Sequence, residues 1–356
     1  MAVYETVLDN NRQWLRDVVP LLQPFTILLE PTERCNFKCN YCIHSTRGQK
    51  GGTYEAEGYE QRNMSWNLFT KIARDIMDFP APVKHISISG LGEPLVHPQL
   101  PEMISHLRSA GFMERISIYT NASLLTPKVS DRLIHAGISE VRVSIQGVDD
   151  EAYKDTCGIS GVLERIVENV RYFFEHKNND QILYVKIIDA ALRNDSERDI
   201  FMNMFGDICD YIFVEHLVSS QRQMHEINFE RDKSRGSINL INQSVAYRRI
   251  CPVPFYYLQI AADGAVTPCG VVAFPKKLAV GNVNNSTLPE IWNGSNHIMA
   301  LRQRLEHGSD SIEACRGCSQ RYTIASPVET IDDHTEEILA RLLKLEQQKD
   351  ETSCPK

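Results

Sequence analysis

The sequence has no long hydrophobic run and no excess of positive charge. Its 356 residues include 38 Lys and Arg against 46 Asp and Glu, a formal net charge of −8 at pH 7. No apolar stretch is long enough to cross a bilayer, so we expect no membrane-spanning segment. The chain also lacks the basic field of nonspecific nucleic-acid binders, so we expect no nucleic-acid partner. Its length suits a globular enzyme with one large domain and a smaller one.

The first residues lack the charged, apolar and small-residue regions of a secretory signal peptide, and no low-complexity tract or short repeat occurs. We therefore expect a cytoplasmic location, where the environment keeps thiols reduced. The chain nevertheless has ten cysteines. Clustered cysteines in a reducing compartment are more typical of metal sites than of disulfides.

Three cysteines lie close together after the apolar stretch 25–30. Cys35, Cys39 and Cys42 fall within eight residues, and no fourth cysteine is nearby in the sequence. Three thiolates can bind three irons of a [4Fe–4S] cubane and leave the fourth iron open to a small ligand. A structural zinc site normally has four ligands, often in spaced pairs, and here only His44 follows. The spacing therefore favours an iron–sulfur cluster with an open iron.

Short apolar runs alternate with segments of helical spacing. Strands are predicted at 25–30, 84–89, 115–119, 140–145, 182–188 and 211–214, and helices at 66–79, 98–110, 128–136 and 161–175. Repeated βα units with apolar strands indicate an α/β fold with a parallel sheet, whose ligands lie at the carboxyl ends of the strands. The most polar stretch, 221–237, is the predicted domain boundary, which gives domains of 1–235, 236–325 and 326–356.

The cysteine loop resembles the CxxxCxxC loop of the radical S-adenosylmethionine (SAM) enzymes, and six βα units suit the partial (β/α)6 barrel of that family. The resemblance implies that the open iron binds SAM. The reduced cluster would cleave SAM to a 5′-deoxyadenosyl radical that abstracts hydrogen from a substrate, with an external electron donor such as flavodoxin or ferredoxin. The protein mainly positions and shields such chemistry.

Segments after three predicted strands carry the same resemblance. Residues 89–94 resemble the GGEP segment with Leu91 inserted, residues 119–122 resemble the TNG turn with Ala122 in place of glycine, and residues 143–147 carry Gln146 where aspartate is common. Taken singly, each segment is equally typical of a turn or a cap. The SAM contacts implied by the resemblance are Tyr41, Gly90, Gly92, Glu93, Asn121, Ser144 and Gln146.

A second cysteine group lies near the C-terminus. It consists of Cys251, Cys269, Cys315 and Cys318, with a hairpin signal at Asp263 and Gly264 between the first two. Four converging thiolates can close a cubane or form a zinc ribbon, and spacing alone leaves both open. The pattern from Cys251 to Cys269, with residues 281–284 and 288–293, resembles the SPASM domain that follows many radical SAM barrels.

Only Cys354 follows Cys318, whereas a full SPASM domain has further cysteines. We therefore expect a small SPASM or twitch-like domain with one auxiliary [4Fe–4S] cluster, hence two clusters in all, together with a β-hairpin. A C-terminal helix is predicted at 332–348, packing on the barrel or on a partner chain. This combination resembles the radical SAM dehydrogenase of butirosin biosynthesis and related enzymes that act on aminocyclitols and amino sugars.

An auxiliary cluster can accept the electron of a ketyl-type radical, so the leading hypothesis is oxidation of a secondary alcohol of a sugar or aminocyclitol to a ketone. Modification of a peptide, by epimerisation or cross-linking, is the alternative. About 24 residues precede the first predicted strand, too few for a fused peptide-recognition domain of the usual sort. A sugar epimerase is the third hypothesis, with Cys157 as hydrogen donor, although a buried structural cysteine is the simpler interpretation.

Polar residues near the predicted strand ends are the candidates for substrate contact. Lys186 and Glu215 are candidate bases for the substrate hydroxyl. Each of these residues is equally typical of a paired or solvated position. The remaining candidates are His44, Arg47, Asp189 and His216, while Cys209 is predicted to lie in the core.

Overall fold

The computed structural model describes residues 1–6, 12–218, 238–241, 243–244, 246–271, 274–316, 318, 321 and 326–353. The predicted domain boundary at 221–237 and the cysteine at 354 lie outside these residues. Within them, no helix is both long and apolar enough to cross a membrane.

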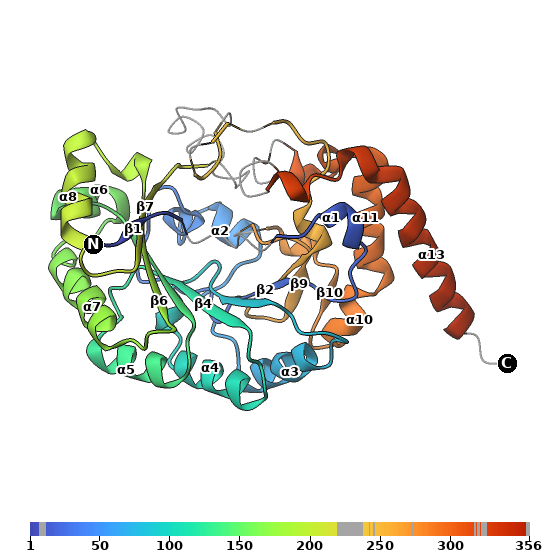
Figure 1. The fold of residues 1–356 in the computed structure, drawn as a ribbon, viewed down its shortest axis with the longest axis horizontal. Coiled ribbons are helices and arrows are strands. Elements are labelled where there is room, and N and C mark those ends of the chain that lie inside the picture. Colours follow the sequence, from blue (N-terminus) through green and yellow to red (C-terminus); the bar gives the residue numbers. More distant parts are fainter. Residues whose placement is uncertain are drawn as a thin grey trace.

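Six parallel strands form the partial barrel that the sequence predicts (Figure 1). Each pairs with its neighbour in chain order. A short strand, β1 (Val3–Tyr4), adds to the edge of the last of them. The six strands are β2 (Thr26–Leu29), β3 (His85–Ile88), β4 (Arg115–Thr120), β5 (Glu140–Ile145), β6 (Ile182–Ile188) and β7 (Tyr211–Glu215).

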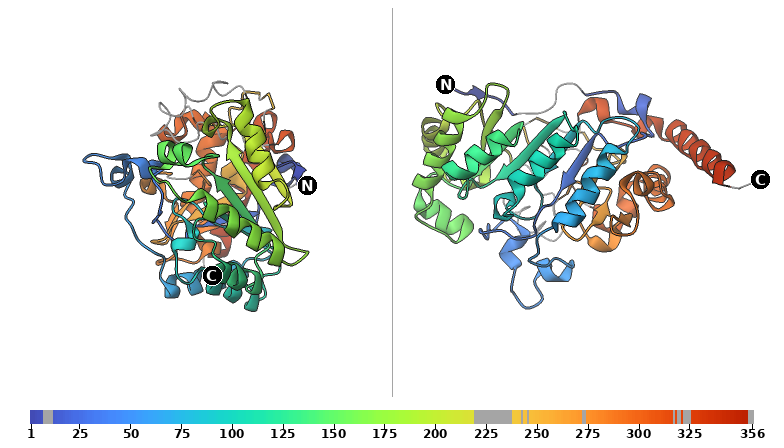
Figure 2. Two further views of the ribbon diagram at one scale, coloured as in Figure 1. Left: turned by 90° about the vertical axis from the view of Figure 1, so that its left-hand side faces the viewer. Right: turned by 90° about the horizontal axis from the view of Figure 1, so that it is seen from below.

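Helices cover one face of this curved sheet (Figures 1 and 2). Side-chain caps fix where several begin, because a polar oxygen accepts a hydrogen bond from an otherwise unpaired helical amide: Ser65 caps α3, Asp149 caps α6 and Asn194 caps α8. The helices between the strands are α2 (Thr53–Ala56), α3 (Trp66–Met77), α4 (Leu100–Ser109), α5 (Pro127–His135), α6 (Asp150–Cys157), α7 (Leu163–His176) and α8 (Asp195–Phe205).

The two faces of the sheet differ in polarity. Alternate strand residues such as Ile86, Ile88 and Val143 belong to the apolar core that packs against the helices. Because successive side chains of a strand point to opposite faces, the residues between them line the other face, which we call the inner face. These are mostly polar, namely His85, Ser87, Ser89, Ser117, Tyr119, Glu140, Arg142, Ser144, Tyr184, Lys186, Glu215 and Gln259.

The predicted C-terminal hairpin continues the barrel sheet. Strand β8 (Tyr257–Ile260) pairs in parallel with β2, and β9 (Ala265–Thr267) returns antiparallel to β8. A last short strand, β10 (Gly281–Asn282), pairs with β9. Gly264 has φ of +86° in the hairpin turn, a conformation that favours glycine. Among the described residues, one sheet of ten strands therefore includes both β2, which leads into the first cysteine loop, and the hairpin of the second cysteine group.

A second apolar cluster holds the C-terminal helices. Helix α13 (Thr335–Ser353) buries Ile338 and Leu342, and α11 (Ser295–His307) buries Leu301 and Leu305 in the same cluster. The N-terminal helix α1 (Leu15–Val18) also packs here rather than on the barrel. The helix predicted at 332–348 therefore packs on α11 and α1 and not on the barrel, and a 3₁₀ turn over Asp332–His334 precedes it. A short helix, α10 (Leu288–Trp292), precedes α11.

Glu30 lies where the barrel meets the hairpin. Its Oε1 accepts hydrogen bonds from the Leu91 amide and from Nε2 of Gln259, each at 2.9 Å. Oε2 of Glu30 and Oε1 of Gln259 are buried without a hydrogen-bond partner among the described residues, which favours a proton on the acid. Burial raises the pKa of Glu30 from 4.5 to about 8 against the opposing effect of the Leu91 hydrogen bond.

We predict that Glu30→Gln removes a pH-dependent loss of stability. A carboxyl whose pKa is raised on folding contributes stability that is complete below pH 4.5 and is lost as the pH rises towards 8. The loss amounts to about 1.4 kcal/mol per pH unit at most. Anaerobic calorimetry at pH 6 and pH 8 should show a clear fall in the melting temperature of the wild type and a smaller fall in the variant. Equal falls in both proteins, or the same flattening in the exposed-site control Glu164→Gln, contradict the prediction.

Candidate active site

The first cysteine group lies on the loop between β2 and the 3₁₀ helix Ile43–Thr46. Burial is the main cause that raises the pKa values of Cys35 and Cys42 to about 12, and neighbouring loop thiols raise both further. The amide of Phe37 donates to Sγ of Cys35 at 3.4 Å. Partly buried thiols that disfavour one another's charge ionise together more readily beside a cation, and a metal cluster would supply it.

Cys157 joins this group in space. It lies at the end of α6, and its Sγ is 3.6 Å from Sγ of Cys39. This contact is the largest cause that raises the pKa of Cys39, ahead of burial. The sequence places no fourth thiol near the loop, so the approach of Cys157 is a finding of the structure. Its role as a hydrogen donor remains a prediction.

The arrangement suits a cluster better than a single ion. Among the described residues, no three Cys, His, Asp or Glu side chains converge tightly enough for one metal ion. A cubane binds each thiolate to a different iron, so its ligands surround the cluster instead of meeting at a point. The loop also keeps its backbone amides close to a ligand sulfur, as at Phe37. The residues present fit an iron–sulfur cluster.

His44 and Arg47 hold the loop in place. Nη1 of Arg47 donates to the carbonyl of Cys35 at 2.9 Å and lies 3.2 Å from Nδ1 of His44. Burial, reinforced by Arg47, lowers the pKa of His44 to about 4, so its ring is neutral at neutral pH. With Nδ1 facing the guanidinium, the ring proton is on Nε2 and is donated to the carbonyl of Leu91 at 3.0 Å. Both predicted substrate contacts therefore have partners within the protein, His44 at Leu91 and Arg47 at Cys35.

The turn after β3 packs directly on the cysteine loop. A Cβ on Gly92 would lie 2.3 Å from the carbonyl oxygen of Thr32, and one on Gly90, at φ +123°, would lie 2.4 Å from Cγ of Glu30. The amide of Glu93 donates to the carbonyl of Arg34 at 2.9 Å. Glycine is required at Gly92 because the two backbones touch there, and at Gly90 because of its positive φ and the buried side chain of Glu30.

Glu93 is a buried carboxyl beside the first cysteine group. It accepts hydrogen bonds from Oγ1 of Thr120 at 2.7 Å and from the amide of Asn121 at 2.8 Å. Burial raises its pKa to about 7 despite these hydrogen bonds. Nδ2 of Asn121 in turn donates to Oδ1 of Asn36 on the loop at 3.0 Å. The structure thus brings Glu93 and Asn121 together next to the cysteines.

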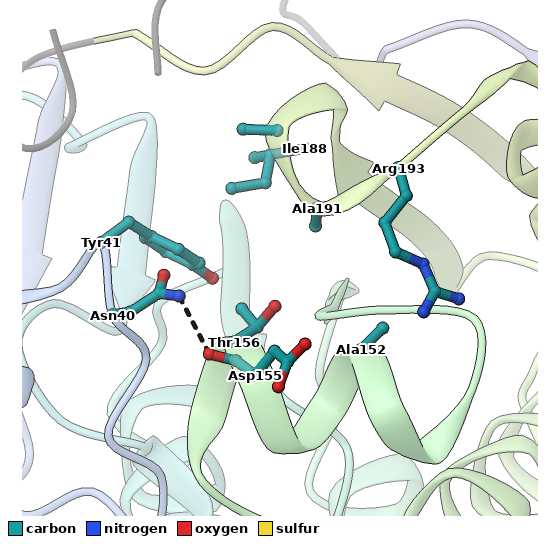
Figure 3. Close-up of a pocket in the computed structure, with 9 residues that line it drawn as sticks. Asn40, Tyr41, Ala152, Asp155, Thr156, Ile188, Ala191 and Arg193 are labelled. Atoms are coloured by element: carbon teal, nitrogen blue, oxygen red, sulfur yellow. Dashed lines mark hydrogen bonds between the residues drawn. The ribbon is translucent and has the colours of Figure 1, made fainter. Parts of the chain in front are cut away.

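Tyr41 lies beside a pocket above the sheet. Its hydroxyl donates to Oε1 of Gln146, whose Nε2 donates to the carbonyl of Ser144 at 3.1 Å. Figure 3 shows Asn40 hydrogen-bonded to the backbone oxygen of Asp155 on α6, and both Asn40 and Tyr41 line a cavity of about 260 Å³. Other lining residues include Ala152, Asp155, Thr156, Ile188, Ala191 and Arg193. The pocket lies at the carboxyl end of the parallel sheet, where such folds bind ligands.

A network of charged and aromatic side chains fills part of the inner face. Lys186 forms an ion pair with Glu215, which also accepts a hydrogen bond from the hydroxyl of Tyr184 at 3.0 Å. Arg142 pairs with Glu140 at 2.6 Å and donates to the Tyr119 hydroxyl at 2.5 Å. The structure brings the two candidate bases together. The sequence reasoning missed the other members, although the strict polar–apolar alternation of β4 and β5 signals them.

Asp189 and His216 lie at the carboxyl ends of β6 and β7. Nδ1 of His216 is 2.6 Å from Oδ2 of Asp189, and the amide of Leu217 donates to Oδ1 of Asp189 at 2.9 Å. The pair therefore links two neighbouring strand ends. Cys209, by contrast, is buried after α8 with its thiol donating to the carbonyl of Phe205, which agrees with its predicted core position.

The second cysteine group assembles at the hairpin. Burial raises the pKa of Cys251 to about 12, with further contributions from Cys318 and Cys315. The pKa of Cys269 is also raised, by burial and then by these same three thiols. The amide of Val271 donates to Sγ of Cys269 at 3.5 Å. All four predicted cysteines are therefore near enough to act on one another's charge.

A salt-bridge cluster connects the hairpin to the first loop. Nζ of Lys276 lies 2.6 Å from Oε1 of Glu33 and 2.6 Å from Oδ2 of Asp263. Glu33 is fully buried two residues before Cys35, and Asp263 lies in the hairpin turn. Burying a charge is costly unless the charge is paired. Lys276 reduces this cost for both Glu33 and Asp263.

Two family models match the chain in succession. The radical SAM superfamily model matches residues 29–202, and the SPASM iron–sulfur cluster-binding domain model matches residues 251–319. They cover the two cysteine groups, one each.

Curated relatives align over most of the chain. A tungsten-containing aldehyde ferredoxin oxidoreductase cofactor-modifying protein from Pyrococcus furiosus is 26% identical over 302 residues, covering 75% of this chain and 80% of the relative. A PqqA peptide cyclase from Granulibacter bethesdensis is 24% identical over 320 residues, covering 84% of this chain and 80% of the relative.

Solved structures align with much of the chain, and SuiB shares its fold. SuiB of Streptococcus suis bound to S-adenosylmethionine aligns with a TM-score of 0.58 and 16% identity, covering 85% of this chain and 74% of SuiB. BtrN in complex with AdoMet and 2-DOIA aligns with a TM-score of 0.49 and 19% identity, covering 82% of this chain and 92% of BtrN.

We predict that Gly92→Ala prevents normal cluster loading. The added Cβ meets a backbone oxygen at 2.3 Å, so the loop that carries Cys35 must move. We expect the anaerobically reconstituted variant to lose about half of its iron and to melt several degrees below the wild type. Gly58→Ala is the control, because its Cβ meets nothing within 4 Å although its φ is +80°. Equal iron contents in Gly92→Ala and the wild type contradict the prediction.

Proposed function

The chain belongs to the radical SAM superfamily and carries a SPASM domain, and we propose that it oxidises a secondary alcohol of a sugar or aminocyclitol to a ketone. Cys35, Cys39 and Cys42 would hold the SAM-binding cluster, and Cys251, Cys269, Cys315 and Cys318 a single auxiliary [4Fe–4S] cluster. When bound, the clusters and SAM supply hydrogen abstraction and an electron acceptor. The balanced reaction converts alcohol and SAM to ketone, methionine, 5′-deoxyadenosine and a proton.

The position of Tyr257 supports this proposal most strongly. A Cβ on Gly270, the residue after Cys269, would lie 2.4 Å from Cε1 of Tyr257. Burial is the main cause that raises the pKa of Tyr257, and Tyr119 and Arg142 of the inner face and Cys269 of the second cysteine group also influence it. Tyr257 is therefore close to both the second cysteine group and the inner face. An electron acceptor there would be within reach of a substrate bound on that face.

The inner face itself suits a hydroxylated substrate. Its hydroxyl, amide and charged groups can donate and accept hydrogen bonds, as between His85 and Ser117 at 2.8 Å. Lys186 and Glu215 offer an ion pair next to these groups, and we assign the carboxylate of Glu215 as acceptor of the substrate hydroxyl proton. Lys186 orients it. The pocket beside Tyr41 suits the SAM nucleoside.

We predict that Glu215→Gln lowers the rate of ketone formation much more than the rate of SAM cleavage. The amide keeps the shape of the side chain but cannot take a proton, so ketone formation should fall by about 10²- to 10⁴-fold. 5′-Deoxyadenosine should still form, uncoupled from product. Asp210→Asn is the matched control, because Asp210 pairs with Lys177 at 3.1 Å just before β7 and away from its carboxyl end. Coupled turnover in Glu215→Gln rules out this assignment.

The reaction itself is tested by metal and product analysis. We expect about eight irons per chain after anaerobic reconstitution, falling to about four in the Cys35→Ala, Cys39→Ala, Cys42→Ala variant. With SAM, dithionite and a panel of aminocyclitols and amino sugars, ketone and 5′-deoxyadenosine should form in equal amounts. Deuterium on the carbinol carbon should appear in 5′-deoxyadenosine. About four irons with bound zinc would remove the built-in acceptor and contradict the proposal.

Peptide modification is the second candidate, because the PqqA peptide cyclase aligns over 84% of this chain. Its test uses the same preparation. SAM cleavage that responds to a peptide and not to any cyclitol or sugar would favour it. An inverted carbon with solvent deuterium and no ketone would instead favour a sugar epimerase, with Cys157 as the donor to mutate first.

A further inference from the structure

Arg304 is a buried arginine beside the second cysteine group. It lies on α11 with only 2% of its surface exposed. Nη2 is 3.7 Å from Sγ of Cys315, and Nη1 donates to the carbonyl of Ala300 at 2.6 Å. Nε is buried without a hydrogen-bond partner among the described residues. Arg304 also lowers the pKa of Cys251, against the dominant effect of burial.

No carboxylate of the described residues lies within ion-pair distance of Arg304. The nearby Arg321 differs, since it is equally buried but pairs with Asp310 at 2.5 Å. An unpaired charge in the protein interior costs several kcal/mol, and a guanidinium cannot shed its proton to avoid this cost. Burial of Arg304 is therefore favourable when an anion lies beside it, and the thiol of Cys315, at 3.7 Å, is a group that can become one.

We propose that Arg304 is the counter-charge and hydrogen-bond donor of the auxiliary cluster, and that it raises the reduction potential of this cluster. The inference rests on the proposed function, because it requires an iron–sulfur cluster at Cys251, Cys269, Cys315 and Cys318. A cubane with four thiolates carries a charge of −2 when oxidised and −3 when reduced. A cation fixed beside it favours the more negative state, and hydrogen bonds to ligand sulfur act in the same direction.

Arg304 would thus act through the cluster, by changing its reduction potential, and would not touch the substrate. Uptake of the substrate electron becomes more favourable because the protein has already placed a positive charge at the acceptor. Water screens this charge little, since the guanidinium is buried and the cysteines are buried or partly buried.

The test is a redox titration of the auxiliary cluster, followed by electron paramagnetic resonance. It uses the full chain with Cys35→Ala, Cys39→Ala, Cys42→Ala, so that the auxiliary cluster alone contributes the signal. Adding Arg304→Gln should shift the electron-transfer equilibrium at least tenfold towards the oxidised cluster, a fall of about 59 mV for one electron. Arg304→Lys should fall less, because it keeps the charge and loses the guanidinium geometry. Arg302→Gln, on the same helix and paired with Glu306 and Glu346, should not shift it.

The outcomes separate this inference from the proposed function. An unchanged potential in Arg304→Gln, at normal iron content, overturns the role of Arg304 and leaves the alcohol oxidation intact. Loss of iron from Arg304→Gln but not from Arg304→Lys supports the counter-charge, and loss from both overturns it in favour of a packing role. Zinc instead of iron in the parent chain would refute the proposed function first.

Discussion

The parallel pairing of β8 with β2 is the constraint on which the rest of the structure depends. β2 leads into the first cysteine loop, and β8 begins the hairpin that ends at Cys269. One row of backbone hydrogen bonds therefore fixes the two cysteine groups relative to each other. Glu30 with Gln259 and Lys276 with Glu33 add side-chain contacts across the same junction. Movement at the junction of β2 and β8 would change the distance between the two cysteine groups.

The polar inner face is the second constraint. A parallel sheet covered by helices on both faces has apolar strands throughout, whereas here only alternate residues are apolar. The charged groups of this face pair with one another, as Arg142 does with Glu140 and Lys186 with Glu215. Such pairing reduces the cost of burying them and leaves a surface with many hydrogen-bonding groups. Under the proposed function, these are the groups that would hold a hydroxylated substrate.

Local patterns in the sequence predict the barrel strands and identify both cysteine groups, because hydrophobic runs and cysteine spacing are short-range signals. The polar–apolar alternation of β5 is an equally short-range signal, and it predicts the polar face of that strand. Contacts between distant segments were beyond such reasoning. The pairing of β8 with β2, the approach of Cys157 to Cys39 and the burial of Arg304 join residues whose separation carries no local signature. Only the folded chain shows them.

The charges around the two cysteine groups differ in sign, and this difference bears on the direction of electron flow. A fully buried acid, Glu93, acts on Cys35 and is an anion above its pKa of about 7, while Arg47, which donates to the Cys35 carbonyl, is partly exposed and therefore screened by water. At the second group the buried charge is Arg304. An anion beside one cluster disfavours its reduction, and a cation beside the other favours it. Under the proposed assignment, the cluster that cleaves SAM is the stronger reductant, and the cluster near the hairpin is the better acceptor. Under the same assignment, buried side chains outside both sets of cysteine ligands would contribute to the order of the two potentials.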